Sequence, residues 1–195
     1  MRCGWLSFRM LSYGRSRCTV QSAFDIGTKN PGTVNIGVTL GIKCAAVTLL
    51  GDILKTLLSC VMCRYVLFSS LGRMAVLYSG IGTALGHGFP FWNKCRGGRG
   101  VAVTCSYVVF YSPFWGIFAD IAGLIVLMLT KYTALGAISI PVIYILPVFI
   151  NYGPNAGFAA AAGAAVVLLL HRDSIKRLAC GTEQKARLPS VFKKR

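Results

Sequence analysis

The segment from Gly86 to Gly100 concentrates the residues that could bind an anion. It reads G-H-G-F-P-F-W-N-K-C-R-G-G-R-G and places five glycines, one histidine and three cations between apolar segments. Glycine leaves the backbone N–H groups uncovered, so Gly97, Gly98 and Gly100 could form a concave anion site, with Arg96 and Arg99 supplying positive charge. The spacing differs from the G-x-x-x-x-G-K-[ST] pattern of nucleotide-binding P-loops. We therefore predict that this segment, the glycine loop, binds phosphate in another way. The alternative is a glycine-rich turn at a membrane surface.

A second turn-rich segment, from Gly27 to Asn35, reads G-T-K-N-P-G-T-V-N. The Pro31-Gly32 pair predicts a turn, and the side chains of Asn30 and Asn35 supply amide donors. We interpret this segment as a second phosphate loop, to which Asn30, Gly32 and Asn35 contribute. The alternative is an ordinary Asn-Pro-Gly turn that binds nothing.

A third polar segment, from His171 to Glu183, reads H-R-D-S-I-K-R-L-A-C-G-T-E. His87 and His171 are the only histidines, and histidine is the side chain that ordinarily titrates near neutral pH. The five acidic residues form no paired-carboxylate or Ser-His-Asp pattern, and no metal-ligand cluster is visible. We expect a site without metal or cofactor that acts by positioning its substrates and stabilising anionic charge.

The composition indicates an integral membrane protein. Of 195 residues, 55% are hydrophobic and only 13% are charged. The net charge of +16 suggests either nucleic acid or anionic lipid as a partner. Long apolar segments separate the cationic clusters, and the basic tail has Phe192 as its one aromatic residue, so we favour the lipid bilayer and expect no nucleic acid. We expect the eight cysteines to be free thiols, since they form no compact secreted framework.

The apolar segments predict an all-α bundle of about seven transmembrane helices, with cytoplasmic glycine-rich loops. A first, degenerate helix is expected within residues 1–26, where four arginines interrupt the apolar residues. The segment 101–111 would span only about 16 Å as a helix, so it must tilt, extend into the glycine loop or be buried in protein. Further apolar segments cover residues 45–63, 74–85, 114–130, 134–150 and 156–170. We expect a single domain over residues 1–188, followed by a basic tail over 189–195.

Two charges lie within the apolar segment 45–63. Asp52 and Lys55 are three residues apart and therefore share a helix face, where we expect them to neutralise each other. The alternative is a role as ligands of a substrate or a proton, because charges within membrane spans usually face a cavity or a partner.

The distribution of cations predicts the orientation. One set of loops carries Lys29, Lys43, the cations of the glycine loop, Lys131 and the eight cations of the tail, whereas the opposite set carries Arg64 and Arg73. The positive-inside rule then places both glycine-bearing loops and the C-terminus in the cytoplasm. Three polar segments that are distant in sequence thus converge on one membrane face.

These three segments resemble the motifs of the PlsY family of bacterial acyl-phosphate:glycerol-3-phosphate acyltransferases. The family's first motif, G-S-x-N-P-G-A-T-N with T-L-G and L-G-D-x-L-K after it, resembles residues 27–35, 39–41 and 50–55. Its second motif, G-H-x-F-P-x-F with G-G-K-G-V-A, resembles residues 86–90 and 97–102. Its third, H-R-x-N-I-x-R-L-x-x-G-x-E, resembles residues 171–183.

The resemblance implies a seven-helix enzyme of the bacterial inner membrane, which transfers a fatty acyl group from acyl-phosphate to the 1-hydroxyl of glycerol 3-phosphate. The products are lysophosphatidic acid and phosphate. By this resemblance, the residues that act in catalysis are Thr28, His171 and Ser174; those that bind substrate or phosphate are Asn30, Gly32, Asn35, His87, Gly97, Gly98, Arg99 and Gly100; and Glu183 supports the structure.

Four positions depart from the family pattern. Thr28 replaces a serine, Arg99 a lysine and Ser174 an asparagine, and Val38 stands where an arginine is expected. The loss of a cation at Val38 leaves the alternative of a weakly active or silent paralogue that binds phosphate or lipid. A small transporter is a third hypothesis, prompted by the intramembrane Asp52, Lys55 and Asp120, although the two halves of the chain show no self-similarity of the kind found in transporters.

Overall fold

The computed structural model describes residues 9–12, 19–22, 32–91, 97–183 and 185. Contacts within the chain divide it into two compact units. One contains the residues up to Gly51 together with those from Pro189, and the other runs from Asp52 to Leu188. The predicted single domain over residues 1–188, with a tail over 189–195, stays a prediction.

The first unit contains a short hairpin and a helix. Strands β1 (Arg9–Ser12) and β2 (Thr19–Ser22) pair antiparallel, with Arg9 opposite Ser22. The prediction of a degenerate first helix within residues 1–26 is therefore wrong for these two stretches. Arginine is costly in a membrane span, and the β-branched Thr19 and Val20 favour a strand.

Helix α1 (Thr33–Leu40) follows Gly32, and helix α2 (Ile42–Met62) begins after Gly41, whose φ of 92° a glycine adopts without strain. Asn35, which we predicted as an amide donor in a phosphate loop, lies in the first turn of α1 and is buried. Val38 lies in the same helix and is 54% exposed.

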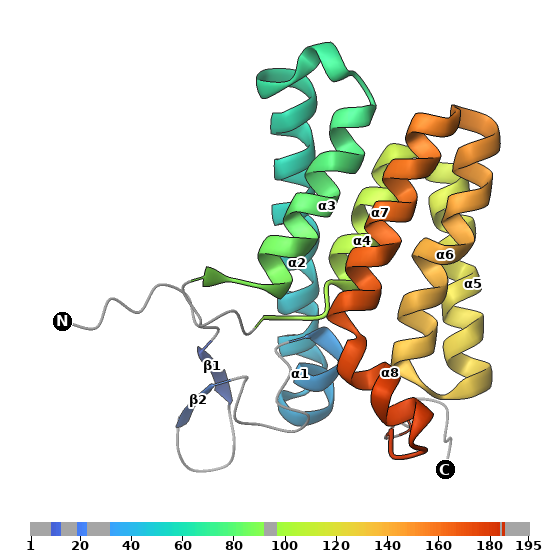
Figure 1. The fold of residues 1–195 in the computed structure, drawn as a ribbon. Helices are drawn as coiled ribbons and strands as arrows, with labels where there is room; N and C mark the ends of the chain where they lie inside the picture. The colour runs from blue at the N-terminus through green and yellow to red at the C-terminus, as the bar shows by residue number, and fades with distance from the viewer. Residues whose placement is uncertain (1–8, 13–18, 23–31, 92–96, 184, 186–195) are drawn as a thin grey trace. The chain divides into compact units, whose positions relative to one another are not determined.

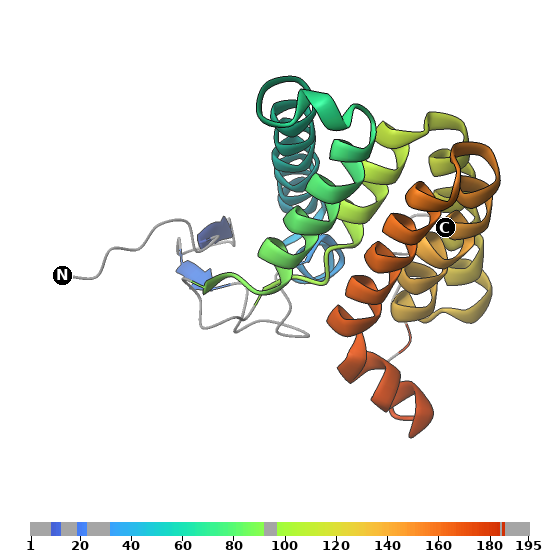
Figure 2. The same cartoon turned by 45° about the horizontal axis from the view of Figure 1, so that its top comes forward.

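The second unit is a helical bundle. The end of α2 leads through a π-helical turn, η1 (Cys63–Leu67), and a 3-10 turn, η2 (Ser69–Leu71), into the bundle helices. These are α3 (Met74–Gly88), α4 (Val101–Tyr111), α5 (Pro113–Thr130), α6 (Thr133–Tyr152), α7 (Pro154–Leu170) and α8 (Arg172–Ala179). Helices α3 to α7 form a closed ring, in which each packs against the next and α7 packs against α3 (Figures 1 and 2).

Short connections and helix-start residues determine where the bundle helices begin and end. Pro113 and Pro154 each occupy the first turn of a helix, where the missing N–H has no intrahelical partner to lose. Gly153 has a φ of 86° and Lys131 a φ of 61°, so the connections from α6 to α7 and from α5 to α6 turn within very few residues. Consecutive helices are therefore antiparallel neighbours.

Helix α4, one member of this ring, has no exposed residue. Val103 and Val108 are fully buried, and Tyr107 is 2% exposed. This confirms that the eleven-residue segment 101–111, too short to cross a membrane alone, is buried in protein. Its neighbours approach closely because glycines face it: a side chain at Gly80 of α3 would overlap the Tyr107 ring.

Within the described residues, three helices are long and apolar enough to cross a membrane: Ile42–Leu67, Pro113–Thr130 and Thr133–Tyr152. A fourth is added if α7 and α8, which are bent by 64° relative to each other, count as one span. Large apolar side chains on α5, such as Ile121, Leu124 and Met128, are more than half exposed, as expected beside lipid. The predicted helical membrane bundle is thus confirmed, whereas the number of about seven spans stays a prediction.

We expect Gly116→Ala to destabilise the bundle. A methyl group at Gly116 would lie 2.5 Å from the Cα of Val109 and 2.6 Å from the carbonyl oxygen of Val108, so α4 and α5 would have to separate. Overpacking of this kind costs about 1–3 kcal/mol. Thermal unfolding of the detergent-solubilised protein measures the effect. Gly82→Ala is the matched control, because nothing lies within 4 Å of that position. Equal unfolding temperatures for the two variants would contradict the close α4–α5 contact.

Candidate active site

The described part of the glycine loop packs directly against the C-terminal end of α3. The backbone N–H of Gly98 donates to the carbonyl oxygen of His87 over 3.1 Å. A side chain at Gly97 would overlap the carbonyl oxygens of His87 and Gly88, and one at Gly98 would overlap the His87 ring. The glycines are thus needed for close approach of two backbones. Because the Gly98 N–H is already used, it is not available to an anion in this arrangement.

Gly100 connects the loop to α4. Its φ of 71° lies in the left-handed region, and the residue is buried at the start of the helix. The carbonyl oxygen of Gly100 accepts hydrogen bonds from the Thr104 backbone N–H, over 2.9 Å, and from Thr104 Oγ1, over 3.0 Å. The first turn of α4 therefore starts at the loop, and its N–H groups and positive dipole end favour negative charge there.

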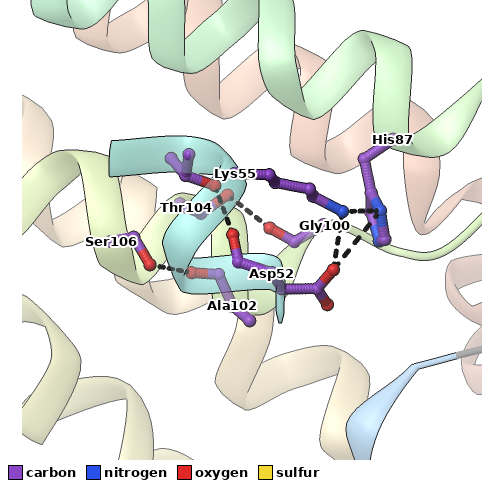
Figure 3. A network of polar contacts seen from close by, with 8 residues as sticks. Asp52, Lys55, His87, Gly100, Ala102, Thr104 and Ser106 are labelled. Atoms are coloured by element: carbon purple, nitrogen blue, oxygen red, sulfur yellow. Dashed lines mark hydrogen bonds and ion pairs between the residues drawn. The ribbon is translucent and has the colours of Figure 1, made fainter. Parts of the chain in front are cut away.

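His87 is joined to α2 by a polar network (Figure 3). Lys55 Nζ donates to Asp52 Oδ1 over 2.6 Å, which confirms that these two charges neutralise each other. Lys55 Nζ also lies 2.7 Å from His87 Nδ1. This second contact was not predicted, because no sequence pattern links residues that are 32 positions apart on different helices.

A second cluster lies where α7 bends into α8. His171 is 1% exposed, and its Nδ1 donates to the Val167 carbonyl oxygen over 2.9 Å. Ser174 is also 1% exposed, and its hydroxyl oxygen accepts from an Arg177 Nη over 2.9 Å. Arg177 Nε donates to Glu183 Oε2 over 2.6 Å, and the Glu183 side chain is only 7% exposed. Glu183 therefore ties the segment after α8 back onto that helix.

The charge of Arg99 interacts with the charged groups of the α8 cluster. Burial lowers the pKa of its guanidinium, and the nearby Glu183 carboxylate opposes that shift. Burial also lowers the pKa of His171; the hydrogen bond to Val167 raises it, and the charge of Arg99 lowers it further. Among the residues that the structure describes, no carboxylate lies within ion-pair distance of Arg99.

The structure therefore brings together, in the second unit, most of the residues that we predicted at the site: His87, Gly97, Gly98, Arg99, Gly100, His171, Ser174 and Glu183. Contact between α3 and α7 is close, since a side chain at Gly88 would overlap Leu170, the residue before His171. Gly32 and Asn35 belong to the first unit, and Thr28 and Asn30 lie outside the described residues. Their part in the site stays a prediction.

The remaining intramembrane acid, Asp120 on α5, stands apart from these clusters. Its Oδ1 atom is buried and has no hydrogen-bond partner among the described residues. No group of three or more metal-ligating side chains occurs in the described ranges.

The chain is similar to known membrane acyltransferases. The family model described as "Glycerol-3-phosphate acyltransferase" matches residues 10–181. The glycerol-3-phosphate acyltransferase of Alkaliphilus metalliredigens is 36% identical over 160 residues, which cover 82% of this chain and 79% of that protein. Glycerol-3-phosphate acyltransferase 1 of Lactobacillus johnsonii is 30% identical over 173 residues, which cover 87% and 81%.

Two crystal structures of PlsY, an integral membrane glycerol 3-phosphate acyltransferase, have a similar fold. The glycerol 3-phosphate form matches with a TM-score of 0.75 and 26% identity, over 88% of this chain and 85% of that one. The lysophosphatidic acid form matches with a TM-score of 0.73 and 27% identity, over 82% and 81%.

The buried His171 should make stability depend on pH. An unfolded histidine has a pKa of about 6.5, and burial lowers the pKa in the folded protein. Above about pH 6.5 the ring is neutral in the folded and the unfolded protein, and its burial costs no stability. As the pH falls toward the folded pKa, the ring takes up a proton only in the unfolded protein, so the free energy of unfolding decreases. Thermal unfolding between about pH 7.5 and 5 should show this loss, and His171→Gln should reduce its slope. Identical slopes would show that His171 is not held neutral.

Proposed function

Since the chain belongs to the glycerol-3-phosphate acyltransferase family, we propose that it transfers a fatty acyl group from acyl-phosphate to the 1-hydroxyl of glycerol 3-phosphate. The observation that carries the proposal is the partly buried Arg99, which has no ion-pair partner among the described carboxylates and whose charge contributes to lowering the pKa of the buried His171. An anionic substrate would complete this arrangement.

The reaction needs a bound phosphate, a hydroxyl acceptor and stabilisation of negative charge. The oxygen of the 1-hydroxyl forms a bond to the acyl carbon, and the bond from that carbon to the phosphate oxygen breaks. Phosphate leaves with the bonding electron pair, and the hydroxyl proton passes to a nearby acceptor. Because Arg99 is charged at all physiological pH values, it can hold a substrate phosphate while charge redistributes.

His171 suits the acceptor role. Its Nδ1 donates to the Val167 carbonyl, so the neutral ring carries its lone pair on Nε2. The carboxylates of Asp52 and Glu183, by contrast, are each engaged with a cation at 2.6 Å. We assign to His171 Nε2 the hydrogen bond from the attacking hydroxyl, and to Ser174 and Arg177 the support of the α8 turn that follows His171.

The side of the membrane follows from the charge distribution. We propose that this site, the tail and the C-terminus face the cytoplasm, because the cations concentrate in these loops. We infer the bacterial inner membrane as the location from the bacterial relatives. The substrates would be acyl-phosphate, entering from the bilayer, and glycerol 3-phosphate, entering from the cytoplasm.

The silent-paralogue alternative rests on two positions. Val38 offers an exposed apolar side chain where the family pattern has a cation, and Ser174 has a shorter reach than asparagine. The double variant Val38→Arg/Ser174→Asn separates the two hypotheses: turnover that appears only in this variant favours a silent native chain. The transporter hypothesis loses the support of Asp52 and Lys55, because these two charges are paired with each other, and Asp120 remains as its only intramembrane charge among the three that prompted it.

The purified protein in detergent should convert palmitoyl phosphate and radiolabelled glycerol 3-phosphate to labelled lysophosphatidic acid. Palmitoyl-coenzyme A should not replace palmitoyl phosphate. The acyl carbon of palmitoyl phosphate is bonded directly to a phosphate that the cations of the site can bind, whereas that of palmitoyl-coenzyme A is bonded to sulfur. Thin-layer chromatography of the lipid extract detects the product. Product formation no higher than with heat-inactivated protein would refute the acyltransferase proposal.

Arg99→Met should raise the KM for glycerol 3-phosphate and lower kcat/KM by about 10- to 100-fold, the effect expected from loss of a charged hydrogen bond. Arg99→Lys keeps the charge and should retain most of the activity. Initial rates at varied glycerol 3-phosphate measure both variants. The matched control is Lys131→Met, which removes an exposed cation from the α5–α6 connection and should leave the KM unchanged. Equal KM values for Arg99→Met and the unaltered protein would exclude Arg99 from the phosphate site.

A further inference from the structure

The two histidines of the chain are held by partners of opposite kind. A neutral imidazole carries a proton on one ring nitrogen and a lone pair on the other, and the partner of one nitrogen determines the state of both. His87 faces an ammonium group at Nδ1, whereas His171 faces a carbonyl oxygen at Nδ1. The consequences for the two Nε2 atoms differ.

The partner of His87 Nδ1 can only donate hydrogen bonds. The ammonium of Lys55 is a donor without acceptor capacity, and its Nζ lies 2.7 Å from Nδ1. Nδ1 must therefore accept, so the ring is neutral and its proton is on Nε2. Asp52 keeps Lys55 in place from 2.6 Å, but its Oδ1 lies 3.8 Å from Nδ1, too far to take a hydrogen bond from the ring.

The Nε2 edge of His87 faces the glycine loop. A side chain at Gly98 would overlap Nε2 and Cε1 of the ring, and the closest ring atom to a side chain at Gly100 would be Cδ2, at 4.0 Å. Nε2 thus lies against Gly98, the residue before Arg99. At His171 the opposite tautomer holds, because the carbonyl of Val167 can only accept and leaves the lone pair on Nε2.

We propose that Asp52 and Lys55 are positioning residues, which hold His87 as the Nε2–H tautomer so that it donates to a substrate phosphate at the glycine loop. His171, held as the Nδ1–H tautomer, accepts from the substrate hydroxyl. The roles of the two rings toward the substrates rest on the proposed acyl transfer, whereas the tautomers themselves follow from the contacts alone. Such a role explains why an ion pair on α2 contacts a histidine at the end of α3 (Figure 3).

Nitrogen-15 NMR of the histidine-labelled protein in detergent tests the tautomers without requiring turnover. With two histidines in the chain, two sets of ring signals are expected near neutral pH, one of each tautomer. Lys55→Met should shift the His87 ring toward a mixture of tautomers and leave His171 unchanged. Lys43→Met, which removes an exposed lysine from the start of the same helix, is the control and should alter neither ring. An unaltered His87 pattern in Lys55→Met would overturn the inference.

Kinetics then test the purpose of the tautomer. Lys55→Met should raise the KM for glycerol 3-phosphate by about tenfold, with a smaller effect on kcat, as expected for loss of a donor to a bound phosphate. Lys55→Arg keeps a donor and should restore part of the affinity. In a His87→Gln background, whose amide has no tautomer to set, Lys55→Met should have little further effect; a full effect of about tenfold there would show that Lys55 acts by another route.

The NMR and activity measurements distinguish failure of the positioning role from failure of the proposed function. If the unaltered protein makes no lysophosphatidic acid but the tautomer pattern is as described, the proposed function fails and the positioning stands. If the protein is active but His87 carries its proton on Nδ1, the positioning fails and the proposed function stands.

Discussion

The close contact between the His87 ring and the backbone of Gly98 is the constraint on which the rest of the site depends. It holds the glycine loop against the end of α3, and the loop in turn starts α4 at Gly100. The same end of α3 admits Leu170 beside Gly88, which brings the start of α8 to the loop. Helix ends that are far apart in sequence are thus held together by backbone contacts that only glycine allows.

Burial of charge shapes the same region. A charge withdrawn from water is costly unless a partner compensates it, and the largely buried carboxylates of Asp52 and Glu183 each have a cation at 2.6 Å. Arg99 is different, because burial lowers its pKa while no described carboxylate is close enough to form an ion pair with it. Cations therefore exceed anions at this end of the bundle. A phosphate would restore the balance, so the arrangement favours an anionic substrate before any reaction begins.

Prediction from the sequence succeeded where the residues that form a pattern lie close together in the chain. The three motifs identified the family, the apolar composition identified the membrane class, and the spacing of Asp52 and Lys55 identified an ion pair on one helix face. Prediction failed near the N-terminus, where residues 9–12 and 19–22 pair as strands instead of forming a helix. Asn35 was expected in a phosphate loop but lies in α1, because the helix begins directly after Gly32.

The sequence by itself determined the residue types of the site: a histidine before the glycine loop, an arginine within it, and a second histidine that opens the polar tail. These residue types are read directly from the sequence, and the functional groups that they supply are the same in any fold. Only the tertiary structure decided which nitrogen of His87 holds the proton, because this depends on Lys55, a partner on another helix. For His171 the deciding partner is local, since the Val167 carbonyl lies four residues earlier in the chain. It also decided that the Gly98 N–H bonds to the protein, since that hydrogen bond exists only when the loop meets the end of α3.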